Sequence, residues 1–399
     1  MERKYYRTLY ASYIGYVTQA IVNNLAPLLF VIFQKEYSLS VVQIGFLVTF
    51  NFAIQILTDL LAAKYVENIG YKPAIIAAHV LSALGLVTLG ILPDMFTSSY
   101  AGLLVSIAIY AVGGGLLEVL VSPIVEALPM DKKSSAMSLL HSFYCWGHVV
   151  VVILSTIFFR TVGISHWRIL PTIWAIIPTF NIFLFASAPI KTLIDKKEAL
   201  SVKSMFKMNI FWIFVLMMIC SGASEQAMSQ WASYFAENGL KVSKTVGDLL
   251  GPCMFAVMMG LSRTFYGIKG EHISLKKFIV GSGAFCIVGY LIASLSPYPV
   301  LSLMGCGLCG LSVGIMWPGV FSLVPVHCPK ASTAMFALLA LSGDVGCALG
   351  PSVVSGISNI FSGNLKSGLA AAIVFPVLLI AGIMFLKHIN VSKEKTSNH

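Results

Sequence analysis

Twelve long apolar stretches constrain this chain more than any other feature of its sequence. An α-helix needs roughly 20 apolar residues to cross the hydrocarbon core of a bilayer, and that core leaves backbone polar groups no partner except within a helix or a closed barrel. The sequence therefore predicts an all-α polytopic membrane protein. The expected spans lie at about 8–34, 41–65, 73–93, 99–129, 134–162, 167–189, 209–237, 245–267, 277–295, 298–326, 331–361 and 366–388.

The charge of the chain bears on its partners. Only 11% of the residues are charged, and the net charge is +10. A basic protein can bind nucleic acid, but these cations form short clusters between apolar runs rather than a stripe interleaved with aromatic residues. We expect the bilayer as a partner and no nucleic acid.

The distribution of the cations predicts the orientation. If both termini are cytoplasmic, only six of the 26 Lys and Arg residues fall on the outer side. Cytoplasmic loops carry an excess of Lys and Arg, so the sequence predicts a multi-pass protein of the cell membrane with both termini in the cytoplasm. The six outer cations are Lys35, Arg160, Arg168, Lys241, Lys244 and Lys366.

The chain divides near its centre. A polar connection at 191–208 reads as a cytoplasmic linker between an amino-terminal bundle, 1–190, and a carboxy-terminal bundle with a short tail, 209–399. The halves also repeat, because Ser135–Leu140 is similar to Thr333–Leu338, and each opens the fifth span of its half. Two pseudo-symmetric six-helix bundles are typical of secondary transporters.

Three acidic residues lie deep in predicted spans. At ~1.5 Å of rise per residue, Glu118 lies ~16 Å, Asp344 ~20 Å and Glu225 ~24 Å from the cytoplasmic ends. A charged acid near the middle of a span costs about 2.5–3.5 kcal/mol, so it needs a partner, a proton or an aqueous cavity. We predict that Glu118 and Glu225 take part in proton coupling and that Glu225 and Asp344 contact substrate. Structural hydrogen bonds and helix packing are the alternatives.

Uncharged polar side chains accompany these acids. The first span carries Gln19, Asn23 and Asn24, and the seventh carries Gln226 and Gln230 beside the acid. Side-chain amides both donate and accept, which suits the hydroxyl groups of a sugar. The alternative is that these amides bond neighbouring helices to one another.

Aromatic residues inside spans complete the predicted binding site. His141 and Tyr144 share a helix face, and Trp146, Trp231 and Trp317 could stack on the apolar face of a sugar ring. A metal site at His141 and His148 would need more ligands nearby. The eight cysteines lie in apolar runs and read as small packing residues, so neither a metal nor another cofactor is expected.

Three charged residues lie near cytoplasmic span ends: Asp59, Glu126 and Arg263. Ion pairs at such ends can hold two bundles together in one state of a transport cycle. We predict a gating role for all three.

The end of the second span resembles a known signature. Asp59–Lys64, closing with Gly70–Lys72, resembles the cytoplasmic loop motif of the major facilitator superfamily, although Gln55 and Ala62 stand where glycines are usual. The resemblance covers essentially the whole chain. It implies the twelve-helix, two-bundle major facilitator fold, with Asp59 docking near the start of the eleventh span to close the inner gate.

Three further segments resemble one branch of that superfamily, the fucose permeases. These are Gly113–Pro123, whose glutamate the resemblance implies in proton coupling, Ser221–Phe235 and Leu139–His148. The branch often has an aspartate in the first span, where this chain has Asn23 and Asn24. A sodium-coupled or uncoupled carrier therefore stays open beside a proton-coupled one.

Together these features predict a monomeric secondary active transporter that imports a sugar or a related hydroxylated solute with a proton. The first alternative is a proton-driven exporter of amphipathic compounds, which the methionine content keeps open. A membrane enzyme or a non-transporting sensor is the other alternative. No enzyme activity is expected, because the sequence lacks the HExxH and phosphate-binding glycine motifs.

Overall fold

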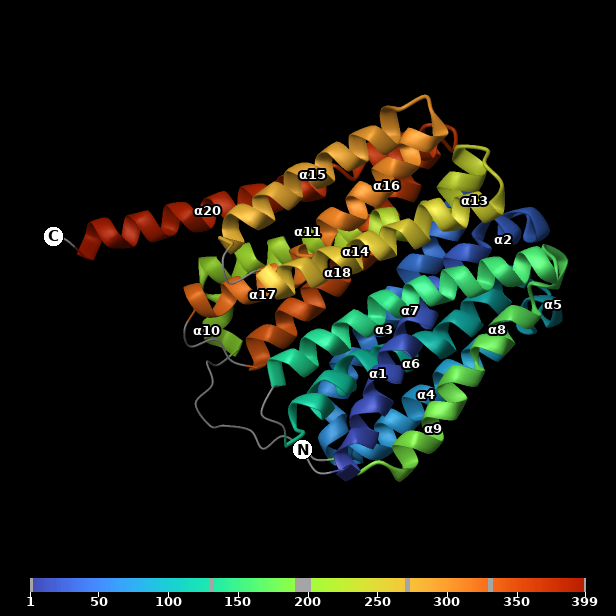
Figure 1. Ribbon diagram of the computed structural model, residues 1–399, viewed down its shortest axis with the longest axis horizontal. Helices are drawn as coiled ribbons and strands as arrows, with labels where there is room; N and C mark the ends of the chain where they lie inside the picture. The colour runs from blue at the N-terminus through green and yellow to red at the C-terminus, as the bar shows by residue number, and fades with distance from the viewer. Residues whose placement is uncertain (1–2, 130–132, 191–201, 270–272, 329–332, 398–399) are drawn as a thin grey trace. The chain divides into compact units, whose positions relative to one another are not determined.

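The structure is a computed structural model that describes residues 3–129, 133–190, 202–269, 273–328 and 333–397 (Figure 1). Every regular element in these ranges is a helix. Twelve helical stretches are long and apolar enough to cross a membrane, which confirms the predicted all-α architecture. They are Tyr5–Tyr37, Val41–Ala62, Tyr71–Leu89, Ser99–Glu126, Leu139–Thr161, Ile169–Ser187, Asn209–Gly239, Lys244–Tyr266, Leu275–Leu295, Pro299–His327, Met335–Ile360 and Leu365–Leu386.

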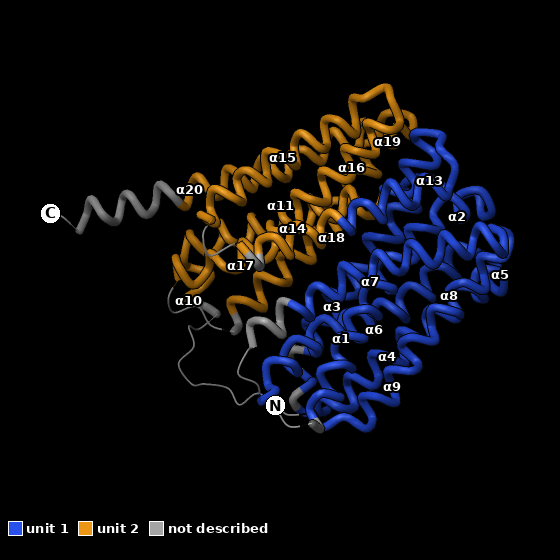
Figure 2. Tube along the Cα trace, in the orientation of Figure 1, with its two compact units in different colours: residues 1–195, 232–257 blue, residues 196–231, 258–399 orange. Residues whose placement is uncertain are grey.

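The chain forms two compact units, coloured separately in Figure 2. The first unit contains Met1–Asp195 and Ala232–Val257, and the second contains Lys196–Trp231 and Met258–His399. The predicted halves differ from these units in one segment, since Ala232–Val257 packs with the first unit. Residues 191–201 of the predicted linker lie outside the described residues.

The first unit holds the first six spans and the ends of the seventh and eighth. Helix α6 packs against α4, α3 and α1, and α7 packs along α1. Its helices are α1 (Arg3–Asn24), η1 (Ala26–Leu29), α2 (Phe30–Tyr37), α3 (Val41–Ile69), α4 (Tyr71–Leu89), α5 (Leu92–Met95), α6 (Ser99–Glu126), α7 (Lys133–Thr161), η2 (Ile164–His166), α8 (Ile169–Trp174), α9 (Ile176–Ser187), α12 (Ala232–Tyr234), η3 (Phe235–Gly239), α13 (Lys244–Asp248) and η4 (Leu249–Cys253).

The second unit is built around α11, which packs along α18 and α20. Its helices are α10 (Val202–Phe206), α11 (Asn209–Ser229), most of α14 (Met254–Lys269), α15 (Leu275–Leu295), α16 (Pro299–Val313), α17 (Met316–His327), α18 (Thr333–Ile360), α19 (Leu365–Ala371) and α20 (Val374–Ser397). The two repeated motifs open α7 and α18, as the repeat predicts, but the side chains of 135–138 lie outside the described residues.

Local sequence explains where several helices begin and bend. Ser40 and Gln43 form a capping box at the start of α3, in which the Ser40 hydroxyl accepts from the Gln43 amide and the Gln43 side chain accepts from the Ser40 amide. Pro27, which cannot donate a backbone hydrogen bond, lies in the short η1 helix that interrupts the first span.

Glycines let the central helices of each unit approach closely. A Cβ atom added at Gly85 of α4 would lie 2.4 Å from the Tyr110 backbone nitrogen of α6. One added at Gly222 of α11 would lie 2.2 Å from the Gly343 carbonyl oxygen of α18. Small residues at such contacts are the usual means of packing helices in lipid.

Candidate functional site

Three consecutive glycines on α6 allow three neighbouring helices to pack closely beside Glu118. A Cβ atom at Gly113 would lie 2.4 Å from the Ser82 hydroxyl oxygen of α4 and 2.6 Å from the Ala78 carbonyl oxygen. One at Gly114 would lie 3.0 Å from Val22 of α1, and one at Gly115 would lie 2.9 Å from the Gln55 carbonyl oxygen of α3. The triplet thus admits a different helix at each position, directly before the acid.

Glu118 is bonded to the first helix by a side-chain amide. Gln19 Nε2 on α1 lies 3.2 Å from Glu118 Oε2 and 3.2 Å from Gln55 Oε1 on α3. A donor aimed at the carboxylate stabilises its charged form. The amide of Gln19 therefore links the acid of α6 to the polar face of α3.

The amide chain continues toward the middle of the first span. Asn23 Oδ1 accepts from Gln55 Nε2 at 2.8 Å and from Asn51 Nδ2 at 3.2 Å. Asn23, Gln19, Gln55 and Asn51 are all buried. Four amides from two helices thus form one connected polar chain that ends on Glu118.

Asn51 and Gln55 were missed by the sequence-based prediction. Gln55 entered only as a departure from a glycine motif, and Asn51 was not considered. Their spacing held the signal, because residues 51, 55 and 59 are separated by four positions and share one helix face that also carries Asp59.

Asp59 lies beside Glu118. The two carboxyl groups interact electrostatically, and Asp59 Oδ1 would be 3.1 Å from a Cβ atom added at Gly115, one helix turn from the glutamate. Oδ1 is buried and has no hydrogen-bond partner among the described residues. The residue predicted to act at a gate therefore also belongs to the surroundings of Glu118.

The other site residues predicted in the first unit are Asn24, His141, Tyr144, Trp146 and Glu126. Asn24 Nδ2 donates to the Ala20 carbonyl at 2.9 Å and lies 3.4 Å from the Tyr144 hydroxyl, and the His141 ring packs edge-on against Tyr16. Trp146 is 44% exposed on the same stripe of α7 as Val150, Ile153 and Leu154, away from His141 and Tyr144. Glu126 is the last residue of α6.

In the second unit, Glu225 lies beside a cation. Its Oε2 is 3.6 Å from Arg263 NH2 of α14, and Gln226 Nε2 is 3.3 Å from its Oε1. Arg263 also donates from Nε to the Gly314 carbonyl at 3.2 Å, between α16 and α17. Arg263, predicted to act at a gate, thus forms part of the Glu225 site. Gln230 extends it by donating to Gln226 at 2.9 Å.

The other candidates of the second unit are packed into it. Trp231 is fully buried, and its indole nitrogen donates to the Pro351 carbonyl at 3.2 Å. In this conformation its ring is packed among protein atoms rather than free to stack on a ligand. Trp317 lies against Gly343, where an added Cβ atom would be 2.2 Å from the ring. Asp344 is buried on the same helix.

The sequence and the fold can be compared with those of known proteins. A family model described as the Major Facilitator Superfamily matches residues 12–351. This chain belongs to the major facilitator superfamily. A search of curated protein sequences finds no significant match to this transporter.

Solved structures of other facilitators share the fold. The fucose:proton symporter of E. coli is 17% identical, with a TM-score of 0.66, over 96% of this chain and 99% of that one. A D-xylose-proton symporter is 14% identical, with a TM-score of 0.75, over 95% of both chains. A bacterial homologue of the human lysosomal transporter Spinster is 14% identical, with a TM-score of 0.77, over 97% and 98%. At these identities the likeness shows the fold alone.

Proposed function

We propose that this transporter moves a sugar or a related hydroxylated solute together with a proton, and that Glu118 binds and releases the proton. The observation that carries the proposal is the amide chain of α1 and α3, which ends on Glu118 beside the second carboxyl group of Asp59. Two neighbouring carboxyl groups in an apolar span repel each other when both are ionised, so the pair favours holding a proton.

The substrate class follows from the polar groups of the two units. Asn23, Gln19 and Gln55 in the first unit, and Gln226 and Gln230 in the second, offer amides that donate to and accept from hydroxyl groups. Similar solved structures include symporters named for fucose and for xylose, each with a proton. We propose Asp344, Asn24, His141 and Tyr144 as further substrate contacts, because their polar side chains can also form hydrogen bonds with hydroxyl groups.

Coupling requires that proton and sugar favour the same conformational step. A ligand that binds both states of a carrier equally well shifts neither, however tightly it binds. Protonation of Glu118 would weaken its attraction for the Gln19 donor and change the hydrogen bonding of Gln55 and Asn23. The amide chain thus supplies a physical route from the proton to groups that could contact the sugar.

The setting of this activity is proposed as well. We infer a monomer in the cell membrane with both termini in the cytoplasm, in which 1–190 and 209–399 move as two bundles joined by 191–208. Asp59, Glu126 and Arg263 would then contribute to the cytoplasmic gate in addition to the contacts described above.

The test uses purified protein in proteoliposomes that contain a pH indicator. Fucose, xylose and glucose are added in turn, and sugar-driven proton movement is recorded. We expect at least one sugar to move protons, and Glu118→Gln to abolish that movement while exchange of the labelled sugar stays within about threefold. Asp94→Asn, an acid-to-amide change in the short helix α5 between two spans, is the matched control and should leave both readings unchanged.

Two outcomes would overturn the proposal. Sugar-driven proton movement that survives Glu118→Gln would remove Glu118 from coupling. Proton movement driven by an amphipathic cation such as ethidium, and by none of the sugars, would instead support the exporter.

A further inference from the structure

One cavity of the first unit lies where several spans end on the same face of the membrane. Its lining comes from α2 at the end of the first span, from the connection between the fifth and sixth spans, and from η3 at the end of the seventh. Counting spans from the amino terminus, these three places lie on the face opposite both termini. We call this space the span-end cavity; its lining lies within residues 31–36, 164–167 and Glu237, all in the first unit.

The span-end cavity is apolar toward the membrane and charged toward the span end. Val31 and Ile32 of α2 are lining residues, and Lys35 and Glu36 follow them by four positions on the same helix face. At ~1.5 Å of rise per residue, the two charges lie ~6 Å nearer the end of the span. Trp167 adds a further apolar wall. This is the order of groups in a phospholipid, whose charged headgroup lies at the membrane surface above its acyl chains.

The size of the cavity also bears on its ligand. Its volume is about 270 Å³. Pockets that enclose a drug-sized molecule have volumes of roughly 300–1,000 Å³. A larger ligand of the span-end cavity must therefore leave most of its atoms outside. A phospholipid meets this condition, because the rest of its acyl chains can stay in the bilayer.

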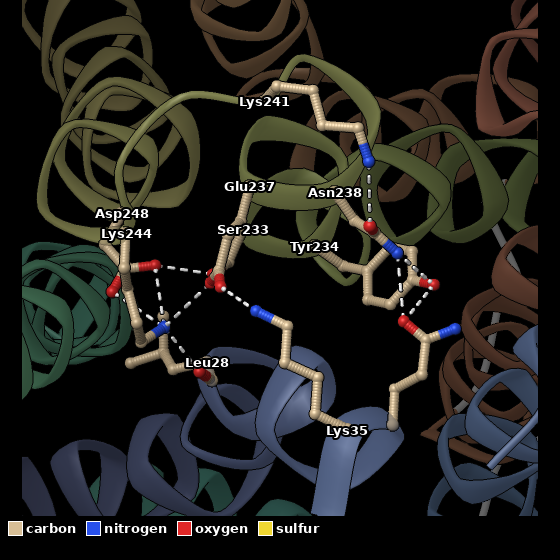
Figure 3. A network of polar contacts seen from close by, with 10 residues as sticks. Leu28, Lys35, Ser233, Tyr234, Glu237, Asn238, Lys241, Lys244 and Asp248 are labelled. Carbon is tan, nitrogen blue, oxygen red and sulfur yellow. Dashed lines mark hydrogen bonds and ion pairs between the residues drawn. The ribbon is translucent and has the colours of Figure 1, made fainter. Parts of the chain in front are cut away.

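Glu237 lines the cavity with an incompletely bonded carboxylate. Its Oε1 lies 3.4 Å from Lys35 Nζ, which is longer than the usual N–H···O distance of about 2.7–3.2 Å. Its Oε2 is buried and accepts no hydrogen bond from the described residues, and Lys244 Nζ lies 3.9 Å from it (Figure 3). The side chain is only 16% exposed. A carboxylate in these surroundings gains from a closer cationic donor.

Lys35 can change its partner at little cost. Its side chain is 72% exposed, and solvent-exposed ion pairs contribute little to stability. Glu36 differs, because it accepts from Trp167 Nε1 at 2.7 Å and from the guanidinium of Arg168. The span-end cavity thus presents one acid and one cation, Glu237 and Lys35, that are joined only weakly.

We propose that the span-end cavity binds a zwitterionic phospholipid with a primary ammonium group, such as phosphatidylethanolamine. The lipid ammonium donates to Glu237, the phosphate accepts from Lys35, and the first methylene groups of one acyl chain lie against Val31 and Ile32. One weak ion pair is thereby exchanged for two charge-assisted contacts. The inference goes beyond the proposed transport function, since it depends neither on the solute nor on the coupling ion.

Native mass spectrometry of the purified full-length protein in detergent tests the site. The protein is mixed with equal amounts of phosphatidylethanolamine and phosphatidylcholine with identical acyl chains, and the first bound lipid is identified. The trimethylammonium group of phosphatidylcholine has no N–H to donate to Glu237. We therefore expect the wild type to bind phosphatidylethanolamine at least about threefold more often, and Glu237→Gln to lower this ratio below about 1.5.

The control for this variant is Asp94→Asn. It removes a carboxylate from the same face of the membrane, but Asp94 does not line the cavity, so the wild-type ratio should remain. A wild-type ratio near one, or an equal fall in Asp94→Asn, would overturn the proposal.

Two further variants test the cavity and the lysine separately. Ser165 is an exposed lining residue, so Ser165→Trp should fold and fill the cavity without a change of charge, and we expect the same fall in the ratio. Lys35→Met should weaken binding of both lipids, because both have a phosphate, whereas Lys241→Met should not, because Lys241 bonds to Asn238 and does not line the cavity. A preference that survives Ser165→Trp, or unchanged binding in Lys35→Met, would contradict the site.

Discussion

Glu118 in the first unit and Glu225 in the second are both glutamates within apolar spans, and different side chains lie beside them. Glu118 accepts from the neutral amide of Gln19 and lies beside the carboxyl group of Asp59. Glu225 lies 3.6 Å from the guanidinium of Arg263. A cation holds a buried carboxylate in its charged form, whereas a second acid favours a bound proton.

This difference bears on the coupling role that the sequence predicts for both residues. Glu118 has a second carboxyl group beside it, that of Asp59. Glu225 has Arg263 beside it, and this contact can orient Gln226 and Gln230. We therefore propose Glu118 as the coupling acid and give Glu225 a place in substrate binding.

Breaking the ion pair of the second unit should have the largest effect on stability. Arg263→Met leaves the Glu225 carboxylate buried without its cation, and we expect a loss of about 3–5 kcal/mol in the free energy of unfolding. The double variant Glu225→Gln/Arg263→Met should recover most of this loss. Thermal unfolding in detergent measures both, and a single variant as stable as the double one would show that the pair does not hold Glu225 charged.

Crowding the glycine triplet should have a smaller effect on the first unit. In Gly113→Ala the new methyl group meets the Ser82 hydroxyl and the Ala78 carbonyl, so helices α4 and α6 must separate. We expect a loss of about 1–3 kcal/mol, the usual range for overpacking. Gly281→Ala is the control, because a Cβ atom there meets no atom within 4 Å. Equal unfolding temperatures for the two variants would argue against tight packing beside Glu118.

Breaking a partly exposed ion pair should have the smallest effect on stability of the three changes. Hydrogen bonds from the Arg168 guanidinium, 2.5 Å from Asp94 Oδ2, lower the pKa of the Asp94 carboxyl below its ordinary value. An acid whose pKa is lower in the folded state adds stability above its ordinary pKa of about 3.9, and this stability is lost as the pH falls through the folded pKa.

Asp94→Asn should therefore reduce the unfolding temperature near pH 7, by the equivalent of less than about 1 kcal/mol, and the two proteins should converge as the pH falls below about 4. Unfolding scans across this pH range measure the difference. A gap that stays constant with pH would show that the carboxylate charge does not contribute.

Much of the fold could be predicted from the sequence, because a chain that spans a bilayer must form helices or a closed barrel. Apolar length predicted the twelve spans, and the loop motif at Asp59–Lys64 predicted the superfamily. Glu118 and its glycines could also be found, since a charge inside an apolar run is conspicuous. The amide partners Asn51 and Gln55 were harder to find, because an uncharged polar residue in a span is not by itself unusual.

The sequence by itself determined that this protein crosses a membrane twelve times and that a few acids lie deep within it, because hydrophobic length and burial of charge are local properties of the chain. Only the tertiary structure decided that Glu225 has Arg263 beside it and that Glu118 has Asp59 beside it. Arg263 is 38 positions from Glu225, and Asp59 is 59 positions from Glu118. Helix packing brings these residues together, and the charge that each acid meets follows from that packing.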